Sequence, residues 1–262
     1  MVIVASYPKS GATWFKRLIH TTTVGEIYFS SNMESSIIYY DVNTNRSKVL
    51  NKIRRGDHFY FKTHYAFNRL NVPYFKEISK SIYIIRNPLD VLASKINHID
   101  AAKGATKLNK KMLDDIVEKE LSIANDEPSK DNNFAGGWNC NVKSWQSQND
   151  IPTLLLKYED ILKSAYDVMQ KVNHYLKLNL ESNQIKNGIK HATFEVMQKQ
   201  EEKEILLDIY GSAQINKRSK AFFHKGVRLV NKGQANNYIN VLEPNVIEKA
   251  KKVYGEVMDQ YY

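Results

Sequence analysis

The feature that most constrains the fold is a strand, a tight turn and a helix at the start of the chain. Val2 to Ala5 form a short apolar run rich in β-branched residues, which predicts a buried strand. Tyr7-Pro8 ends this run, Lys9-Ser10-Gly11 makes a tight turn, and apolar residues then recur at helical spacing. Such a turn directs backbone N–H groups and the positive end of the helix dipole at one point. That point suits a phosphate or a sulfate, but for a strand, a turn and a helix considered alone, an ordinary turn with a solvated lysine is the favoured interpretation.

The same residues match a known motif. The stretch from Tyr7 to Trp14 reads Tyr-Pro-Lys-Ser-Gly-Ala-Thr-Trp. It resembles the phosphosulfate-binding loop of the sulfotransferases that use 3′-phosphoadenosine 5′-phosphosulfate (PAPS), which usually reads Tyr-Pro-Lys-Ser-Gly-Thr-Thr-Trp. Only Ala12 departs from it, and the Gly-x4-Gly-Lys-Ser/Thr spacing of ATP-type loops is absent. The resemblance implies that the donor is bound by these residues: Lys9, Ser10, Gly11, Ala12, Thr13 and Trp14.

A second candidate group follows the next apolar strand. The run His58 to Lys62 predicts a buried strand, which ends in Lys62-Thr63-His64. Ligands of open parallel sheets lie beyond the carboxyl ends of the strands, so Lys9 and His64 emerge at one edge if the two strands are neighbours. A histidine at a strand end is more often structural than catalytic. The Lys-Thr-His string, however, resembles the catalytic strand end of sulfotransferases. The resemblance implies that His64 is the general base and that Lys62 adds positive charge.

A third strand leads into a candidate phosphate site. Ser81 to Arg86 predicts the strand, and Arg-Asn-Pro-Leu-Asp-Val-Leu-Ala-Ser spans Arg86 to Ser94. Pro88 suits the first turn of a helix, and Asp90 suits its positive end. A guanidinium at the strand end and a serine two turns along the helix can converge on one phosphate, although they can also be unrelated surface groups. The string resembles the family's 3′-phosphate motif, which implies that Arg86 and Ser94 hold that phosphate.

Two later segments resemble the family's contacts with the nucleotide base. Thr153 to Lys157 predicts a fourth strand, followed by Tyr158-Glu-Asp, whose two acids are expected to open the next helix. The family has the same Tyr-Glu-Asp, with its tyrosine near the base. Further along, His191-Ala-Thr-Phe194 resembles the family's adenine-side segment, commonly His-Thr-Ser-Phe. The resemblance implies that Tyr158 and Phe194 lie beside the base, while Ala192 replaces a residue that is usually a hydroxyl.

The family's last motif has two candidate counterparts. This motif, Arg-Lys-Gly-x-x-Gly-Asp-Trp-Lys, is a loop that closes on the 3′-phosphate. Residues 222–226, Phe-Phe-His-Lys-Gly, copy its lead-in, whereas residues 231–238, Asn-Lys-Gly-Gln-Ala-Asn-Asn-Tyr, better copy its distance from the end of the chain. The second is preferred, which implies donor contacts from Asn231, Lys232 and Gly233. Under either alignment the arginine is missing, replaced by Asn231 or His224, and a tyrosine replaces the tryptophan.

The rest of the chain predicts helices and loops around these strands. Residues 25–57 predict a loop and then a short helix near Ser47 to Arg54. Gln198 to Lys220 is charged and weakly patterned, which predicts a mobile loop. No repeat or low-complexity linker divides the sequence, so a single domain is expected. The resemblance, which spans nearly the whole length, implies a single sulfotransferase domain over residues 1–262. Apolar spacing predicts further helices that contain residues 108–121, start at 136–138, contain 168–176 and start at Pro244.

Composition narrows the class of protein. The 262 residues are 42% hydrophobic and 25% charged, as in ordinary globular proteins. Cys140 is the only cysteine, which excludes an internal disulfide framework and fits a reducing, cytoplasmic location. No apolar run approaches the roughly 20 residues that cross a bilayer, and the first strand begins too early for a signal peptide to precede it. The net charge of +10 fits an anionic partner, but a solvated lysine-rich surface accounts for most of it.

These motifs together predict one fold and one reaction. The fold is α/β in three layers, with a central, mainly parallel sheet flanked by helices and a P-loop-like phosphosulfate-binding loop. The resemblance implies sulfuryl transfer from PAPS to an acceptor hydroxyl or amine, with His64 as base and Lys9 offsetting the charge that builds on the transferred group. Trp14 and Phe194 would stack on adenine. Since lysines supply the positive charge, no metal is required. The acceptor is expected to be a small molecule, and neither its identity nor the oligomeric state can be predicted.

Three alternatives stay open. A phosphoryl transferase of the P-loop type shares the strand–loop–helix geometry, but the sequence lacks its lysine spacing and an obvious Mg²⁺-holding aspartate at a strand end. The net charge admits a nucleic-acid-binding module, although no known reader motif or patch of arginines and aromatics supports one. A sulfotransferase-like protein that binds the nucleotide but has weak activity is the third, because the final loop is altered.

Overall fold

A parallel β-sheet of five strands forms the centre of the computed structural model, which describes residues 1–25, 37–39, 46–56, 59–69, 74–103, 108–131, 134–206 and 233–262. β1 pairs in parallel with both β3 and β4. This confirms the four predicted strands and meets the condition, set out above, that the first strand neighbours the one before His64. The strands are β1 (Val2–Ser6), β2 (Ile37–Tyr39), β3 (Tyr60–Thr63), β4 (Lys80–Ile85) and β5 (Thr153–Lys157), in the order β2-β3-β1-β4-β5.

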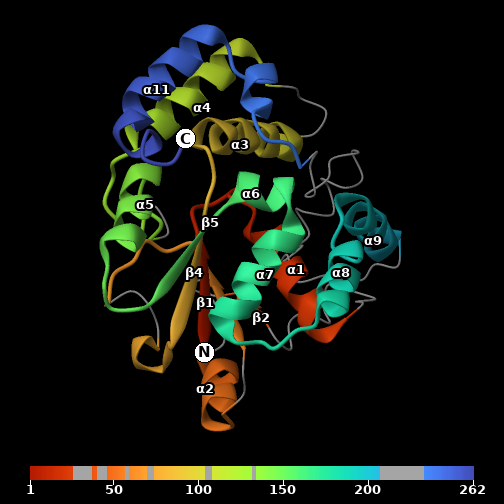
Figure 1. The fold of residues 1–262 in the computed structure, drawn as a ribbon. Helices are drawn as coiled ribbons and strands as arrows, with labels where there is room; N and C mark the ends of the chain where they lie inside the picture. The colour runs from red at the N-terminus through yellow and green to blue at the C-terminus, as the bar shows by residue number, and fades with distance from the viewer. Residues whose placement is uncertain are drawn as a thin grey trace.

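Helices cover both faces of the sheet, which gives the three layers that the sequence predicts (Figure 1). One face is covered by α3 (Pro88–Lys103), α4 (Lys110–Ser122), α5 (Trp138–Ser147) and α11 (Pro244–Met258). The other face is covered by α1 (Ala12–Val24), α6 (Tyr158–Lys163), α7 (Ala165–Leu176), α8 (Ser182–Lys190) and α9 (Phe194–Leu206). Three further elements pack against the core on the first face: α2 (Arg46–Arg54) and two short 3₁₀ turns, η2 (Phe75–Glu77) and η3 (Asn237–Asn240).

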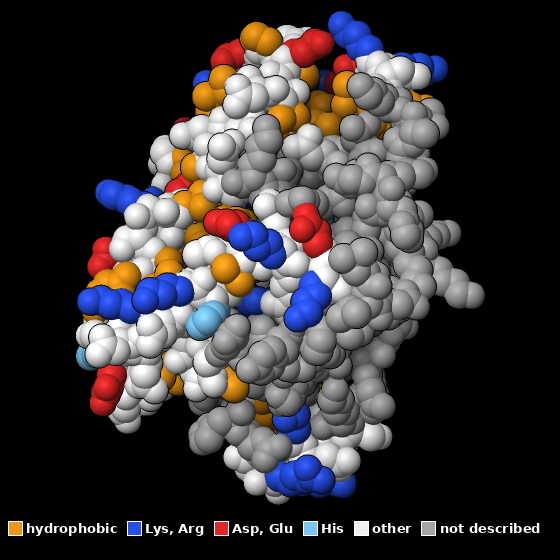
Figure 2. All heavy atoms as spheres, turned by 90° about the vertical axis from the view of Figure 1, so that its right-hand side faces the viewer, with side chains coloured by type: hydrophobic (Ala, Val, Ile, Leu, Met, Phe, Trp, Pro, Cys, Tyr) orange, Lys and Arg blue, Asp and Glu red, His pale blue; other side chains and the backbone are white. Residues whose placement is uncertain are grey.

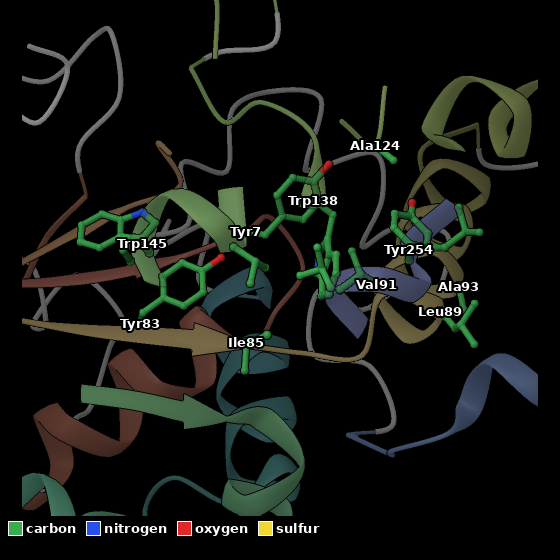
Figure 3. Close-up of a cluster of buried hydrophobic side chains, with 14 of the residues drawn as sticks. Tyr7, Tyr83, Ile85, Leu89, Val91, Ala93, Ala124, Trp138, Trp145 and Tyr254 are labelled. Carbon is green, nitrogen blue, oxygen red and sulfur yellow. The ribbon is translucent and has the colours of Figure 1, made fainter. Parts of the chain in front are cut away.

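Successive side chains of the central strands enter two separate cores. Ile3 of β1 packs into the core under α3, α5 and α11, whereas Val4 packs into the core under α1 and α7. Figure 3 shows the first core, in which the ring of Tyr83 stacks on Trp145 at 5.9 Å and Trp138 meets Tyr254 edge to face at 5.6 Å. Because both faces are buried, the strands must be apolar along their whole length, which is why they could be recognised.

Two expectations about the connecting segments are wrong. Residues 25–57 include β2, a strand of three residues that pairs only with β3, and so short a strand at the sheet edge leaves no usable alternation in the sequence. The predicted loop from Gln198 is helical as far as Leu206, and the remainder of that loop lies outside the described residues. α9 is held by the buried pair Arg17 and Gln200, a contact with α1 that local sequence does not reveal. The helix α8 was not predicted.

Charge on the described surface is mixed in sign. Figure 2 shows lysine and arginine side chains among acidic ones over the coloured part of that face, with no single patch that collects the net charge there. Within the ranges that the structure describes, no helix has the length and apolar character needed to cross a bilayer.

Gly188 and Gly255 form a matched pair for testing how tightly α8 packs on α1. A Cβ at Gly188 would lie 2.5 Å from Cα of Thr22, while a Cβ at Gly255 in α11 would meet nothing within 4 Å. We expect Gly188→Ala to lower the free energy of unfolding by about 1–3 kcal/mol, because backbone cannot yield as a flexible side chain does. Gly255→Ala should raise it by up to about 1 kcal/mol, since alanine favours a helix interior. Urea unfolding of both variants measures this, and an equal response would contradict the close packing.

Candidate active site

A pocket of about 270 Å³ lies beyond the carboxyl ends of the strands. Asn231 and Lys232 lie outside the described residues, and Ser10 and Lys62 do not line the pocket. The structure brings together in its wall these predicted site residues: Lys9, Gly11, Ala12, Thr13, Trp14, His64, Arg86, Ser94, Tyr158, Phe194 and Gly233. Residues that were not predicted to contact the donor also line it: Asp90, Asn97, Met197, Gln234 and Asn237.

The unpredicted wall residues follow the predicted ones at regular spacings. Asn97 and Met197 lie three residues beyond Ser94 and Phe194 on the same helices, so the helical repeat around each motif is a signal that could have found them. Gln234 and Asn237 belong to the stretch 231–238, and their position agrees with the preferred alignment of the final loop. Residues 222–226, the competing stretch, lie outside the described residues.

The turn between β1 and α1 is shaped for a close approach to the pocket. Gly11 has φ +93° and directly precedes α1, and a Cβ on it would lie 2.3 Å from the ring of Tyr158. Glycine is therefore required both by the backbone conformation and by space. Lys9 also has a positive φ of +69°, which is unfavourable for a residue with a side chain. The first N–H groups of α1 have no acceptor within the helix, so they can bind an anion at this end.

His64 follows β3 and is oriented by the end of β1. Its Nδ1 lies 2.8 Å from the backbone oxygen of Ser6. Because a carbonyl oxygen only accepts, Nδ1 carries the proton and donates a hydrogen bond to the backbone oxygen of Ser6. The lone pair of the ring is then on Nε2. Burial and the neighbouring Lys62 lower the pKa of His64 to about 3, against the weaker opposing effect of the Ser6 bond. The imidazole is therefore neutral near pH 7, with Nε2 unprotonated. A pKa this low makes it a weak base, and an anion bound in the pocket would raise that pKa.

Two lysines near the histidine also have lowered pKa values. Burial, with smaller contributions from Arg86 and Lys95, lowers the pKa of Lys9 to about 8. Burial, together with Lys16 and Lys9, lowers the pKa of Lys62 to about 7. Both shifts mean that the positive charges are partly desolvated and repel one another. A negatively charged ligand in the pocket would raise both values again.

Arg86 connects three parts of the pocket. Its Nη1 donates to the backbone oxygen of Lys9 at 3.0 Å, and its Nη2 donates more weakly to that of Gln234 at 3.4 Å. The guanidinium also lies over the ring of Tyr158, 4.4 Å from its centre. The contact with Lys9 holds the unfavourable backbone conformation of that residue, so Arg86 supports the turn as well as lining the pocket.

Two buried polar atoms beside the pocket have no hydrogen-bond partner in the described structure, Ser10 Oγ and Arg86 Nε. A buried polar group without a partner costs about 1–3 kcal/mol. Of the two residues only Arg86 lines the pocket, where a ligand with acceptor oxygens, such as a phosphate ester, would give its Nε a partner. Among the described residues, no group of three His, Cys, Asp or Glu side chains is placed to hold a metal ion.

Three aromatic rings form one wall of the pocket. Trp14 packs against Phe194 at 4.7 Å between ring centres and meets Tyr158 edge to face at 5.8 Å. Nε1 of Trp14 donates to the backbone oxygen of Ala192 at 2.8 Å, so Ala192 contributes through its backbone. Gly233 closes over Phe194, since a Cβ there would lie 2.3 Å from the ring. This wall is suited to a flat aromatic group such as a nucleotide base.

Comparison with known proteins identifies what this arrangement resembles. The model of the sulfotransferase domain family matches residues 1–262. Sulfotransferase 2A1 of the rat (Rattus norvegicus) is 25% identical over 98% of this chain and 84% of its own length. The 3-alpha-hydroxysteroid sulfotransferase of the guinea pig (Cavia porcellus) is 23% identical over 99% of this chain and 84% of its own length. The crystal structure of mouse sulfotransferase SULT7A1 complexed with PAP has the same fold, with a TM-score of 0.69. The two sequences are 19% identical, and the match covers 99% of this chain and 84% of that one.

The lowered pKa of His64 makes a prediction about stability in acid. The folded-state pKa is about 3 and the unfolded value is about 6.5, so between these values the unfolded chain binds a proton that the folded chain does not. Stability is therefore lost as the pH falls below about 6.5. Between pH 7 and pH 5, wild type should lose up to about 2 kcal/mol more than His64→Gln in urea unfolding. His174→Gln, which removes an exposed histidine of α7, should retain the wild-type pH dependence. If the free energy of unfolding changed with pH in the same way for wild type and His64→Gln, the lowered pKa of His64 would be contradicted.

Proposed function

The chain belongs to the sulfotransferase domain family, and from that premise we propose how its pocket transfers a sulfuryl group from PAPS to an acceptor hydroxyl or amine. The observation that carries the proposal is the convergence, in one pocket, of a neutral histidine, the N-terminus of α1 and Arg86, whose buried Nε lacks a partner. Bound PAPS supplies an activated sulfuryl group on its 5′-phosphate. The residues of the chain bind and orient it, and they move one proton.

His64 is the proposed general base. Its Nε2 takes the proton of the acceptor hydroxyl as the acceptor oxygen forms its bond to sulfur. The bond between sulfur and the bridging oxygen breaks, and adenosine 3′,5′-bisphosphate leaves with that electron pair. The bond from Nδ1 to Ser6 keeps the imidazole in the required tautomer and orientation. Base catalysis of this kind contributes about 10²–10⁴-fold in rate.

Lys9 and the start of α1 stabilise the charge that develops on the leaving phosphate and the sulfuryl oxygens. The backbone N–H groups of Gly11, Ala12 and Thr13 need no reorganisation at the moment of reaction, because the turn fixes them in advance. The N–H of Ser10 instead donates to the backbone oxygen of Tyr7 at 3.3 Å. Ala12 leaves this function intact, since only a side-chain hydroxyl is absent. Lys62 does not line the pocket, so its proposed contribution is the positive potential it adds behind His64.

The second phosphate of the donor is assigned to the other end of the pocket. Arg86 and Ser94 hold the 3′-phosphate, with Arg86 Nε gaining the partner that it otherwise lacks. Trp14, Tyr158 and Phe194 enclose the adenine. Contacts from Asn231 and Lys232 stay predictions from the sequence, while Gly233 lies against Phe194, where such a loop would close.

The acceptor is a small molecule in this proposal. The guinea pig relative is named for a hydroxysteroid, which supports an apolar alcohol as one candidate class. Family membership favours sulfuryl transfer over phosphoryl transfer or nucleic-acid binding. The proposal includes a single domain over residues 1–262 and a cytoplasmic location. Nucleotide binding with weak activity, because of the altered final loop, stays the alternative.

Replacing His64 separates binding from transfer. His64→Ala should lower the rate of sulfuryl transfer from labelled PAPS by about 10²–10⁴-fold, because the acceptor proton loses its base. The dissociation constant for adenosine 3′,5′-bisphosphate, measured by calorimetry, should change less than threefold. The acceptors tested are a phenol, a hydroxysteroid and an aliphatic amine, and His174→Ala on the exposed side of α7 is the control. Unchanged transfer in His64→Ala would overturn the assignment of the base.

Arg86 is tested against the phosphate that it is proposed to hold. Arg86→Ala should raise the dissociation constant for adenosine 3′,5′-bisphosphate by about 10- to 150-fold, as expected for a lost charge-assisted bond of about 1.5–3 kcal/mol. Adenosine 5′-phosphate lacks the 3′-phosphate, so its dissociation constant should rise much less. Arg69→Ala removes an exposed arginine that pairs with Asp150 and is the control. Equal losses for the two nucleotides would show that Arg86 acts only through the turn at Lys9.

A further inference from the structure

Asp90 bonds to a segment far along the chain rather than to its own helix. It lies in the first turn of α3, and only 1% of it is exposed. One carboxylate oxygen accepts from the backbone N–H of Asn236 at 2.8 Å, and the other accepts from that of Tyr238 at 3.0 Å. The start of α3 is capped separately, since the side chain of Asn87 accepts from the N–H of Leu89 at 2.9 Å. The two oxygens of Asp90 are therefore committed to residues 236–238.

The backbone of this segment is shaped to receive an anion. Asn236 has a left-handed conformation (φ 58°, ψ 20°), and the 3₁₀ turn η3 starts at the next residue. A left-handed residue followed by a helical one turns successive N–H groups toward one side, which makes a small anion-binding concavity. Here the anion is the carboxylate of Asp90. The two backbone N–H groups donate charge-assisted hydrogen bonds to the carboxylate, and such bonds are stronger than those between neutral groups.

The segment attached in this way is part of the pocket wall. Gly233, Gln234 and Asn237 line the pocket together with Asp90 itself. Gly233 lies against the ring of Phe194, and Gln234 accepts the weak bond from Arg86 at 3.4 Å. The two bonds to the Asp90 carboxylate, at 2.8 and 3.0 Å, are shorter than the single bond from Arg86 to this segment.

We propose that Asp90 is a positioning residue, a latch that holds residues 233–238 against the pocket and so sets how long the nucleotide stays bound. This inference rests on the proposed function of the same pocket. The latch acts on the wall beside Phe194 and Arg86, remote from the proton taken by His64. Loss of the two bonds to Asp90 should weaken nucleotide binding and speed nucleotide dissociation without slowing the transfer step.

The first test uses Asp90→Asn, which keeps the shape but replaces one accepting oxygen with an amide group that faces an N–H. The dissociation constant for adenosine 3′,5′-bisphosphate should rise about tenfold, with a matching rise in its dissociation rate. In kinetics, KM for PAPS should rise while the single-turnover transfer rate at saturation stays within twofold. Asp167→Asn, at the first turn of α7, is the control for losing an acid at a helix start. An unchanged dissociation constant in Asp90→Asn would overturn the latch.

A second pair of variants tests the same contact from an exposed position, where folding is not at risk. Asn236→Pro removes the N–H and cannot adopt a φ near +58°, so it should reproduce the tenfold loss. Asn236→Gly keeps both properties and should bind within twofold of wild type. If the proline and glycine variants bind alike, the bonds to Asp90 do not control the pocket.

Hydrogen exchange without nucleotide separates this inference from the proposed function. In Asp90→Asn and Asn236→Pro, peptides that cover residues 233–242 should exchange at least tenfold faster than in wild type, while α3 should be unchanged. Unchanged exchange in that segment would overturn the latch whatever the protein binds. A wild type that shows no binding of adenosine 3′,5′-bisphosphate would instead overturn the proposed function, and with it the role of the latch in holding nucleotide.

Discussion

The pairing of β1 with β3 on one side and β4 on the other is the constraint on which the site depends. Strands that run in one direction deliver the residues that follow them to one edge, so Lys9, His64 and Arg86 meet although they are far apart in sequence. Helices bury both faces of the sheet, which requires apolar side chains along each strand. Polar groups are then confined to the strand ends. The packing of the core therefore concentrates the chemistry of the protein in one pocket.

This concentration of cationic groups opposes folding unless an anion is bound. Burial lowers the pKa values of Lys9 and Lys62, and each shift measures free energy that the charged ammonium loses in the folded state. Ser10 Oγ and Arg86 Nε add the cost of buried atoms without partners. A ligand with two separated anionic groups relieves both costs, because it brings opposite charge and acceptor oxygens. The features that weaken the chain on its own thus favour a bisphosphate over a singly charged ligand.

Much of the architecture could be predicted, since buried parallel strands need apolar runs and the motifs lie where those runs end. β2 could not be predicted, because a three-residue edge strand leaves too short a pattern. α9 could not either, since its sequence is highly charged and its attachment is the contact between Arg17 and Gln200. Within the site, His64 and Ser94 were predicted from motifs and both line the pocket, but the bonds of Asp90 could not be predicted. They join segments 146 and 148 residues apart, and no local signal encodes such a contact.

The departures from the family's motifs fall where the backbone carries the function. Ala12 keeps the N–H that the turn needs, and its side chain is buried. Asn236 stands where the motif has its second glycine, and asparagine tolerates the left-handed conformation found there better than most residues. Gly233 is retained, because any side chain would strike Phe194. In the proposed assignment, Arg86 binds the 3′-phosphate while its Nη1 holds the turn at Lys9. Loss of Arg86 would then alter both ends of the pocket.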